Sequence, residues 1–336
     1  MKRIVYVLAL AAACVLSVAA QTNRRATTTA APATQAMSGA LAALPASDAV
    51  MAVDVQRLYK EALPRIFASE PTKLAEINAD IEDFKTRTGL DPRSFERVAV
   101  GVRFVDLPGG GVKLAPVAIA RGSFNAGALV AAGRIAAQGK YQEQQYKGKT
   151  VYLFNLGQQV KFLNLRWAEL AVVILDAHTL AFGQPDRVRA AVDTHGGGAR
   201  VSNDVVALAQ RDPNAIIGLG GNIPASLTRQ LDFLSPEISR SVASIRQFYG
   251  TVGASTSGFE MLTVLRTGSA TDARNLSETV EGLRMLAPLG IARLRGDKAK
   301  LAQQLVDSTK VTTEGSEVQI RLDLADANVA TLVQVF

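Results

Sequence analysis

The first twenty residues have the composition of a secretory signal, and this feature most constrains what the rest of the chain can become. Lys2 and Arg3 precede an apolar run from Ile4 to about Ser17, and Val18-Ala-Ala20 places small residues where a signal peptidase reads them. We therefore expect cleavage after Ala20. The mature protein should then fold outside the cytoplasm, in the periplasm or at the cell surface, without these residues.

Two alternatives to cleavage remain open. The segment from Ile4 to Ala20 holds seventeen residues without a charge, which is the lower limit for crossing a bilayer, so an uncleaved anchor is one alternative. Lipidation at Cys14 is the other. However, Ala11 stands where lipoprotein signals normally have Leu, and Cys14 falls inside the apolar run. Both facts argue against lipidation, and cleavage after Ala20 is preferred over either form of membrane attachment.

After the signal, residues 21–40 read as a disordered linker. They are rich in Thr and Ala and have few large apolar side chains that could be buried. The only cysteine in the chain is Cys14, which leaves with the signal. The mature chain therefore has no disulfide, no thiol nucleophile and no thiolate metal ligand, which suits an oxidising compartment in a chain of this length.

The net charge of +7 becomes +5 once Lys2 and Arg3 are removed. A modest positive charge favours solubility and weak attraction to anionic surfaces. Nucleic-acid binding would require basic clusters interleaved with aromatic side chains, but aromatic residues make up only 6% of the chain. We therefore expect no nucleic acid among the partners.

The hydrophobic pattern predicts an α+β protein with two similar halves, 41–198 and 199–336, each a mostly antiparallel sheet packed against long amphipathic helices. The boundary is placed at Gly196-Gly-Gly198. In the first half the pattern predicts strands or hairpins at 49–55, 98–104, 114–120, 141–156 and 169–183, and helices at 71–88, 125–138 and 185–192.

The second half follows a similar order. A strand is expected at 215–219, and Ser235-Pro-Glu237 is a strong helix start, with Ile238, Val242, Ile245 and Phe248 forming its buried face. A strand at 259–266 is followed by a helix from Thr271, whose inward residues are expected to be Leu276, Val280, Leu283 and Leu286. A hairpin at 311–324 and a short helix from Ala327 complete the chain. This internal repeat is a hypothesis drawn from element order.

Several turn motifs resemble a family of exported bacterial proteins that is known only as a domain of unknown function. The motifs are the LPADT-like start Leu44-Pro-Ala-Ser-Asp48, the hairpin turn Tyr146-Lys-Gly148, and Leu180-Ala-Phe-Gly183 followed by a short helix and Gly196-Gly-Gly198. The resemblance would cover residues 44–336. It implies an extracytoplasmic fold with two α+β parts and carries over no catalytic or binding residue.

The residues offer few sites for catalysis or metal binding. The only histidines, His178 and His195, fall in predicted loops without metal-ligand spacing, and no Gly-x-Ser-x-Gly elbow is present. Gly218-Leu-Gly220-Gly221 lacks the third glycine of a dinucleotide fingerprint and reads as a strand end that turns into a helix. We therefore expect no catalytic residues, no metal site and no cofactor.

Two charged clusters remain. The acidic residues Glu76, Asp80, Glu82 and Asp83 share a helix with Lys73, Lys85 and Arg87, as expected for a solvated helix face. The densest basic cluster is Arg293, Arg295, Lys298 and Lys300, expected in a loop between helices. It is the candidate site for contact with an anionic surface, such as envelope lipid or cell-wall polymer.

Export, a disordered linker and few reactive side chains together favour a non-enzymatic binding or scaffold module of the cell envelope. Its partner would be an envelope lipid, a cell-wall polymer or a protein. One alternative is an extracytoplasmic hydrolase whose site is assembled from scattered Asp, Ser and Arg residues. Another is a membrane-anchored accessory subunit.

Overall fold

The computed structural model describes residues 39–88, 91–108, 111–137, 139–162, 165–228, 235–256, 258–326 and 328–329. The expected signal, nearly all of the expected linker, and most of the expected last helix lie outside these ranges. The described strands are β1 (Ala49–Asp54), β2 (Phe95–Asp106), β3 (Val112–Gly122), β4 (Tyr141–Tyr146), β5 (Lys149–Phe162), β6 (Leu165–Asp176), β7 (Thr179–Gly183), β8 (Ile217–Asn222), β9 (Ile245–Ala254), β10 (Gly258–Thr267), β11 (Thr309–Glu314) and β12 (Glu317–Ala325).

The described helices cover the sheet and connect its strands. They are α3 (Val55–Arg57), the π-helical turn η1 (Leu58–Ala62), α4 (Leu63–Ile66), α5 (Pro71–Thr88), the 3-10 turn η2 (Pro92–Ser94), α6 (Ala126–Ala137), α7 (Pro185–His195), α8 (Asn203–Ala209), α9 (Ala225–Thr228), α10 (Pro236–Ala243), α11 (Ala270–Ile291) and α12 (Asp297–Ser308). The predicted mixture of helices and antiparallel strands is confirmed.

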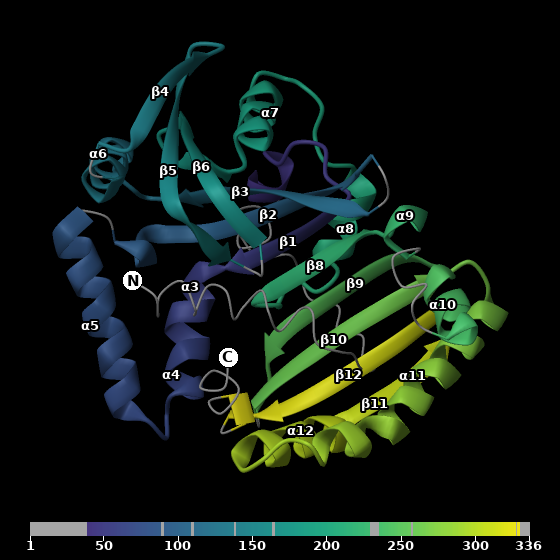
Figure 1. Ribbon diagram of the computed structural model, residues 1–336. Helices are drawn as coiled ribbons and strands as arrows, with labels where there is room; N and C mark the ends of the chain where they lie inside the picture. Colours follow the sequence, from purple (N-terminus) through teal and green to yellow (C-terminus); the bar gives the residue numbers. More distant parts are fainter. Residues whose placement is uncertain are drawn as a thin grey trace.

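The twelve described strands form one antiparallel sheet in the order β11-β12-β10-β9-β8-β1-β2-β3-β7-β6-β5-β4. The predicted boundary at 196–198 does not divide this sheet, because β1 pairs with β8 from Ala49 opposite Gly221 to Val53 opposite Ile217. Figure 1 shows β1 and β8 side by side in the middle of the molecule, with α11 and α12 along the β11–β12 end.

The alternation of side chains along the strands divides the helices between the two faces of the sheet. Val50 and Ala52 of β1 pack with α7 and α8 in one cluster of buried residues. Val53 points to the other face and packs with α3, η1 and α4. On β12, Ile320 packs against α11, and Leu322 belongs to the cluster of α3, η1 and α4. Residues two apart on a strand point to the same face, so α11 and α3–α4 cover the same face of the sheet.

The glycines of β8 allow a helix to approach the sheet closely. A Cβ atom on Gly218 would lie 2.0 Å from the carbonyl oxygen of Ala209 in α8, and one on Gly220 would lie 2.4 Å from Cβ of Leu208. The predicted strand end that turns into a helix start is confirmed, because β8 ends at Asn222 and α9 begins at Ala225. Gly218 and Gly220 serve the close packing of α8 on β8.

The helix that begins after Ser235 is shorter than predicted. The Ser235 Oγ atom accepts a hydrogen bond from the Ile238 backbone, as expected for an N-cap, but α10 ends at Ala243. Ile245 and Phe248, which were expected on the helix, belong to β9 instead. Pairing of β9 with both β8 and β10 satisfies its backbone groups on both sides, and this tertiary pairing outweighs the local helical pattern.

Candidate functional site

Helix α11 is fixed to the sheet through its first three turns. The Ser269 Oγ atom caps the helix by accepting a hydrogen bond from the Asp272 backbone N–H at 3.1 Å. Ala273 and Leu276 are buried against Val318 and Ile320 of β12. This part of α11 therefore has an ordinary amphipathic arrangement, with small and apolar residues inward.

The outward face of the same helix changes character along its length. In the first half Thr271, Asn275 and Glu278, which follow one another at spacings of three and four, are exposed and polar. In the last turns the exposed positions are apolar. The exposed fractions are 50% for Leu283, 72% for Met285, 59% for Leu286 and 70% for Leu289.

The prediction that Leu283 and Leu286 face inward was therefore wrong. Beyond Val280 the inward stripe of the helix continues through Arg284, Ala287 and Ile291, all of them half-buried. Because these three residues already fill the positions next to the protein, the leucines project sideways and outward. The sequence does contain a signal for this outcome, since apolar residues in the last turns cover too wide an arc for all of them to be buried.

The predicted basic cluster lies directly after these exposed residues. Arg293 and Arg295 are exposed in the turn between α11 and α12, together with Leu294, which is 43% exposed. Neither guanidinium has a hydrogen bond or ion pair with another described residue. Lys298 and Lys300, expected in the loop, are instead part of α12; Lys300 is exposed, and the side chain of Lys298 lies outside what is described.

Backbone hydrogen bonds hold this turn in place after the last turn of α11. Ala292 N–H donates to the Pro288 carbonyl at 2.9 Å, Arg293 N–H to the Gly290 carbonyl at 3.1 Å, and Leu294 N–H to the Ile291 carbonyl at 2.8 Å. The exposed side chains of Leu283, Met285, Leu286, Leu289, Arg293, Leu294 and Arg295 are called the α11 patch below.

Charge also changes between the first part of α11 and the segment that holds its last turns, the following turn and the start of α12, and the ion pair of Glu281 with Arg284 at 2.7 Å joins the two segments. The segment 270–282 carries three acidic residues and one basic residue, a net charge of −2. The segment 283–300 carries five basic residues and one acidic residue, a net charge of +4. The apolar side chains of the α11 patch therefore lie in the positive part of the segment.

Elsewhere the notable charged groups stabilise the fold. Arg97 and Asp54 form a buried ion pair at 2.7 Å, and the same carboxylate accepts a hydrogen bond from the Arg57 backbone at 2.9 Å. Sequence analysis did not anticipate this pair, because Asp54 and Arg97 are far apart along the chain and meet only through the pairing of β1 with β2. The pair joins β1 to β2 and ties the start of α3 to the sheet.

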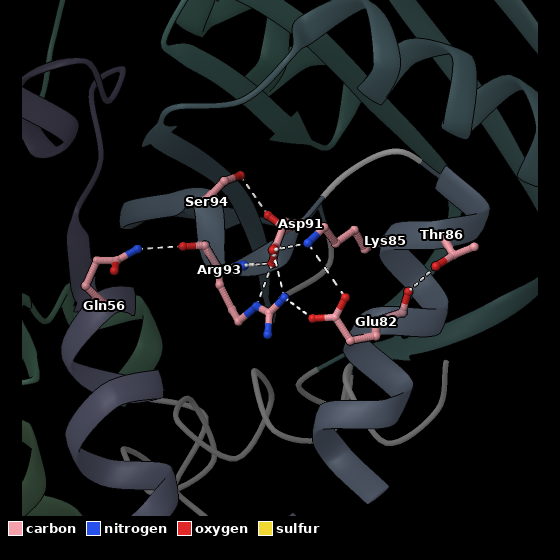
Figure 2. Close-up of polar contacts among 7 residues, drawn as sticks. All are labelled: Gln56, Glu82, Lys85, Thr86, Asp91, Arg93 and Ser94. Atoms are coloured by element: carbon pink, nitrogen blue, oxygen red, sulfur yellow. Dashed lines mark hydrogen bonds and ion pairs between the residues drawn. The ribbon is translucent and has the colours of Figure 1, made fainter. Parts of the chain in front are cut away.

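Among the acidic residues of α5, Glu82 belongs to a second network of charged groups. Asp91 and Arg93 of the following turn form a bidentate contact, with Nε–Oδ1 and Nη2–Oδ2 distances of 2.8 Å, and Arg93 also binds Glu82 (Figure 2). Lys85 Nζ lies 3.3 Å from Asp91 Oδ2. The guanidinium of Arg93 lowers the pKa of Asp91 to about 2. This network fastens the end of α5 to the start of β2.

Both histidines of the chain lie at exposed positions. His178 is exposed in the β6–β7 turn, and His195 is exposed as the last residue of α7, not in a loop as expected. Within the described ranges no group of three or more His, Cys, Asp or Glu side chains is placed to hold a metal ion. The same part of the chain contains no helix that is both long and apolar enough to cross a bilayer.

Comparisons with known proteins find only distant similarity. No protein-family model matches the chain, and no curated protein matches it. Crystal forms III and I of TP0453 align with 88% of this chain and with 98% and 97% of their own chains. Their sequence identities are 12% and 11%, and their TM-scores are 0.45 and 0.44. A similarity this distant transfers no function.

Proposed function

We propose that this chain is an exported, non-enzymatic module of the cell envelope that binds its partner through the α11 patch. Export rests on the signal-like residues 1–20. The linker predicted over residues 21–40 would act as a spacer after cleavage up to the point where the fold begins, since Ala40 is buried in the core. The resemblance to exported bacterial proteins of a domain-of-unknown-function family also supports the proposal of export. The binding role rests on the structure of α11.

The observation that carries the proposal is the change on the outward face of α11. A helix that only covers a sheet has no need of apolar side chains on its solvent side, and monomeric soluble proteins rarely expose them in contiguous groups. In the first half of α11 the exposed outward positions hold polar residues such as Asn275 and Glu278. In the last turns the exposed positions hold Leu286 and Leu289. Arg293 and Arg295 add two cations whose guanidinium groups have no partner among the described residues.

A sedimentation experiment tests whether the patch is a binding surface. The purified chain from Gln21 to Phe336 is mixed with isolated bacterial envelopes, which contain membrane and cell wall, and the bound fraction is measured after centrifugation. We expect the protein to sediment with the envelopes. The double variant Leu286→Glu/Leu289→Glu should remain in the supernatant, since two charges replace the apolar contact area.

The matched control places the same two charges on the same helix outside the patch. Thr271→Glu/Asn275→Glu changes exposed residues in the polar half of α11 and should leave sedimentation unchanged. Equal sedimentation of both double variants and the natural sequence would contradict the proposal. Circular dichroism should show that both variants keep the native helix content.

We further propose that residues 41–198 and 199–336 are two similar halves related across the β1–β8 pair. Outward from that pair the strand orders are β1-β2-β3-β7-β6 and β8-β9-β10-β12-β11. In both halves a helix follows the central hairpin, α6 after β3 and α11 after β10. The hairpin β4–β5 is additional in the first half. Superposition of the halves in an experimental structure tests this, and a mismatch of these five strands would contradict it.

A further inference from the structure

The chemistry of the α11 patch distinguishes between classes of partner. Its apolar members are Leu and Met, and no aromatic side chain belongs to it. Protein interfaces are enriched in Tyr, Trp and Phe, which form their central anchors, and also in Met and Arg. Helices that lie in the surface of a membrane combine Leu, Trp or Phe on one face with Lys and Arg on the polar face. The leucines and arginines of the patch fit a membrane surface, and the assignment of a lipid partner rests on the charge of the segment.

The charge of the segment is complementary to an anionic surface. The net charge of +4 between residues 283 and 300 follows directly on the net charge of −2 between 270 and 282. An anionic bilayer attracts nearby Lys and Arg side chains and repels acidic ones. The charge of the segment therefore favours approach by the last turns of α11 and the first turn of α12, with the acidic first half of α11 directed away.

The geometry limits how deeply the chain could insert. Leu276 and Val280 hold α11 against β12, and the turn after α11 is closed by its own hydrogen bonds. The side chains of the patch are exposed at the end of α11 and in the turn that follows. They can reach the boundary between headgroups and acyl chains while the helix stays packed on the sheet.

We propose that the partner of the α11 patch is the surface of an anionic lipid bilayer, into which Leu286 and Leu289 insert while Arg293 and Arg295 contact headgroup phosphates. This inference rests on the proposed function and specifies its partner. The contact is shallow and reversible, as expected for a few aliphatic side chains assisted by a few cations.

Vesicle binding by the chain from Gln21 to Phe336 tests the inference. We expect sedimentation with vesicles of phosphatidylglycerol and phosphatidylcholine, and little with phosphatidylcholine alone. Arg293→Gln/Arg295→Gln should weaken binding about 25-fold, at about fivefold per cation, and added salt should weaken it as well. Leu286→Glu/Leu289→Glu should weaken it about 100-fold or more. The control Thr271→Glu/Asn275→Glu should bind the anionic vesicles at least half as well as the natural sequence.

A fluorescent label reports insertion directly and does not depend on loss of binding. After removal of the signal the chain has no cysteine, so Leu289→Cys and Asn275→Cys each provide one labelling site on the same helix. A polarity-sensitive dye at position 289 should shift to the blue on addition of anionic vesicles, and the same dye at 275 should not. Identical spectra at the two positions, or equal binding to both kinds of vesicle, would overturn the inference.

The two proposals fail in different ways. If the protein ignores lipid vesicles but its sedimentation with envelopes still depends on Leu286 and Leu289, the lipid inference is wrong and the binding surface stands. A protein or a wall polymer is then the partner. If envelope sedimentation does not depend on the patch, the proposed function itself is wrong.

Discussion

Helices α6 and α11 each follow a β-hairpin and cover the same face of the sheet, but they use their basic and apolar residues differently. In α6, Arg134 pairs with Glu143 and lies over the rings of Tyr141 and Tyr152, at 5.6 and 5.5 Å from their centroids. Its one large exposed apolar side chain is Ile135. In the α11 region, Arg293 and Arg295 have no such partners among the described residues.

This difference separates residues whose side chains make contacts within the fold from exposed residues that could contact another molecule. A single exposed Ile on α6 is ordinary, since folded proteins expose much apolar surface in isolated positions. Four exposed apolar residues lie within seven positions of α11, next to two arginines that have no partner in the described part of the chain. Packing on the sheet does not require such a concentration. The contrast assigns a structural role to α6 and an additional, external role to the end of α11.

The largest effect that tests this contrast compares two leucines of the same helix. Leu276 is 2% exposed and Leu289 is 70% exposed. Leu276→Ala should lower the free energy of unfolding by about 2–5 kcal/mol, because it removes buried contacts and leaves a cavity. Leu289→Ala should change it by less than about 0.5 kcal/mol. Denaturant unfolding of both variants measures the difference, and comparable losses would show that the end of α11 is covered.

Most of the strands could be predicted from the sequence, but the exposed leucines of the α11 patch could not. The strands at 49–55, 98–104 and 114–120 have a clear alternation that local packing preserves, and they are β1, β2 and β3. By contrast, Ile245 and Phe248 fit a helical stripe, and only pairing with β8 and β10 makes them part of a strand. The orientation of Leu283 and Leu286 also depends on tertiary contacts, because other residues of α11 fill the inward positions.

The basic residues Arg293 and Arg295 were found from sequence, since charge density is visible without a fold. That these arginines lie next to exposed leucines could not be predicted. A period of 3.6 residues identifies an apolar stripe on a helix, but it does not show where the sheet beneath that helix ends. The buried pair of Asp54 and Arg97 was equally invisible, since it depends on the register of β1 against β2.

A smaller effect tests whether the first half of α11 serves the fold alone. Ser269→Ala removes the N-cap hydrogen bond to Asp272 and should cost about 1 kcal/mol of stability. Vesicle binding should be unchanged at temperatures where the protein stays folded, because the cap lies at the opposite end of the helix from the patch. Ser269→Thr, which keeps the hydroxyl, is the control. A loss of binding in the folded Ser269→Ala protein would show that the two ends of α11 act together.

The smallest expected effect compares Arg93, which forms an ion pair with Asp91, with Arg293, which has no such partner among the described residues. Asp91, held by Arg93, has its pKa lowered from 3.8 to about 2. Since the folded state binds the proton of Asp91 less readily than the unfolded state, the pair stabilises the protein above about pH 4. This contribution is lost as the pH falls through about 2. Because both partners reach solvent, it should amount to less than about 1 kcal/mol.

The unfolding free energy of Asp91→Asn should therefore fall less between pH 4 and pH 2 than that of the natural sequence. Arg293→Gln should follow the natural profile, since Arg293 has no carboxylate partner among the described residues whose protonation could matter. Urea unfolding at a series of pH values measures both. If Arg293→Gln also flattened the acid profile, Arg293 would be paired with a carboxylate of its own chain. It would then be a residue of the fold like Arg93 and Arg134, and the external role assigned to the end of α11 would lose one of its two cations.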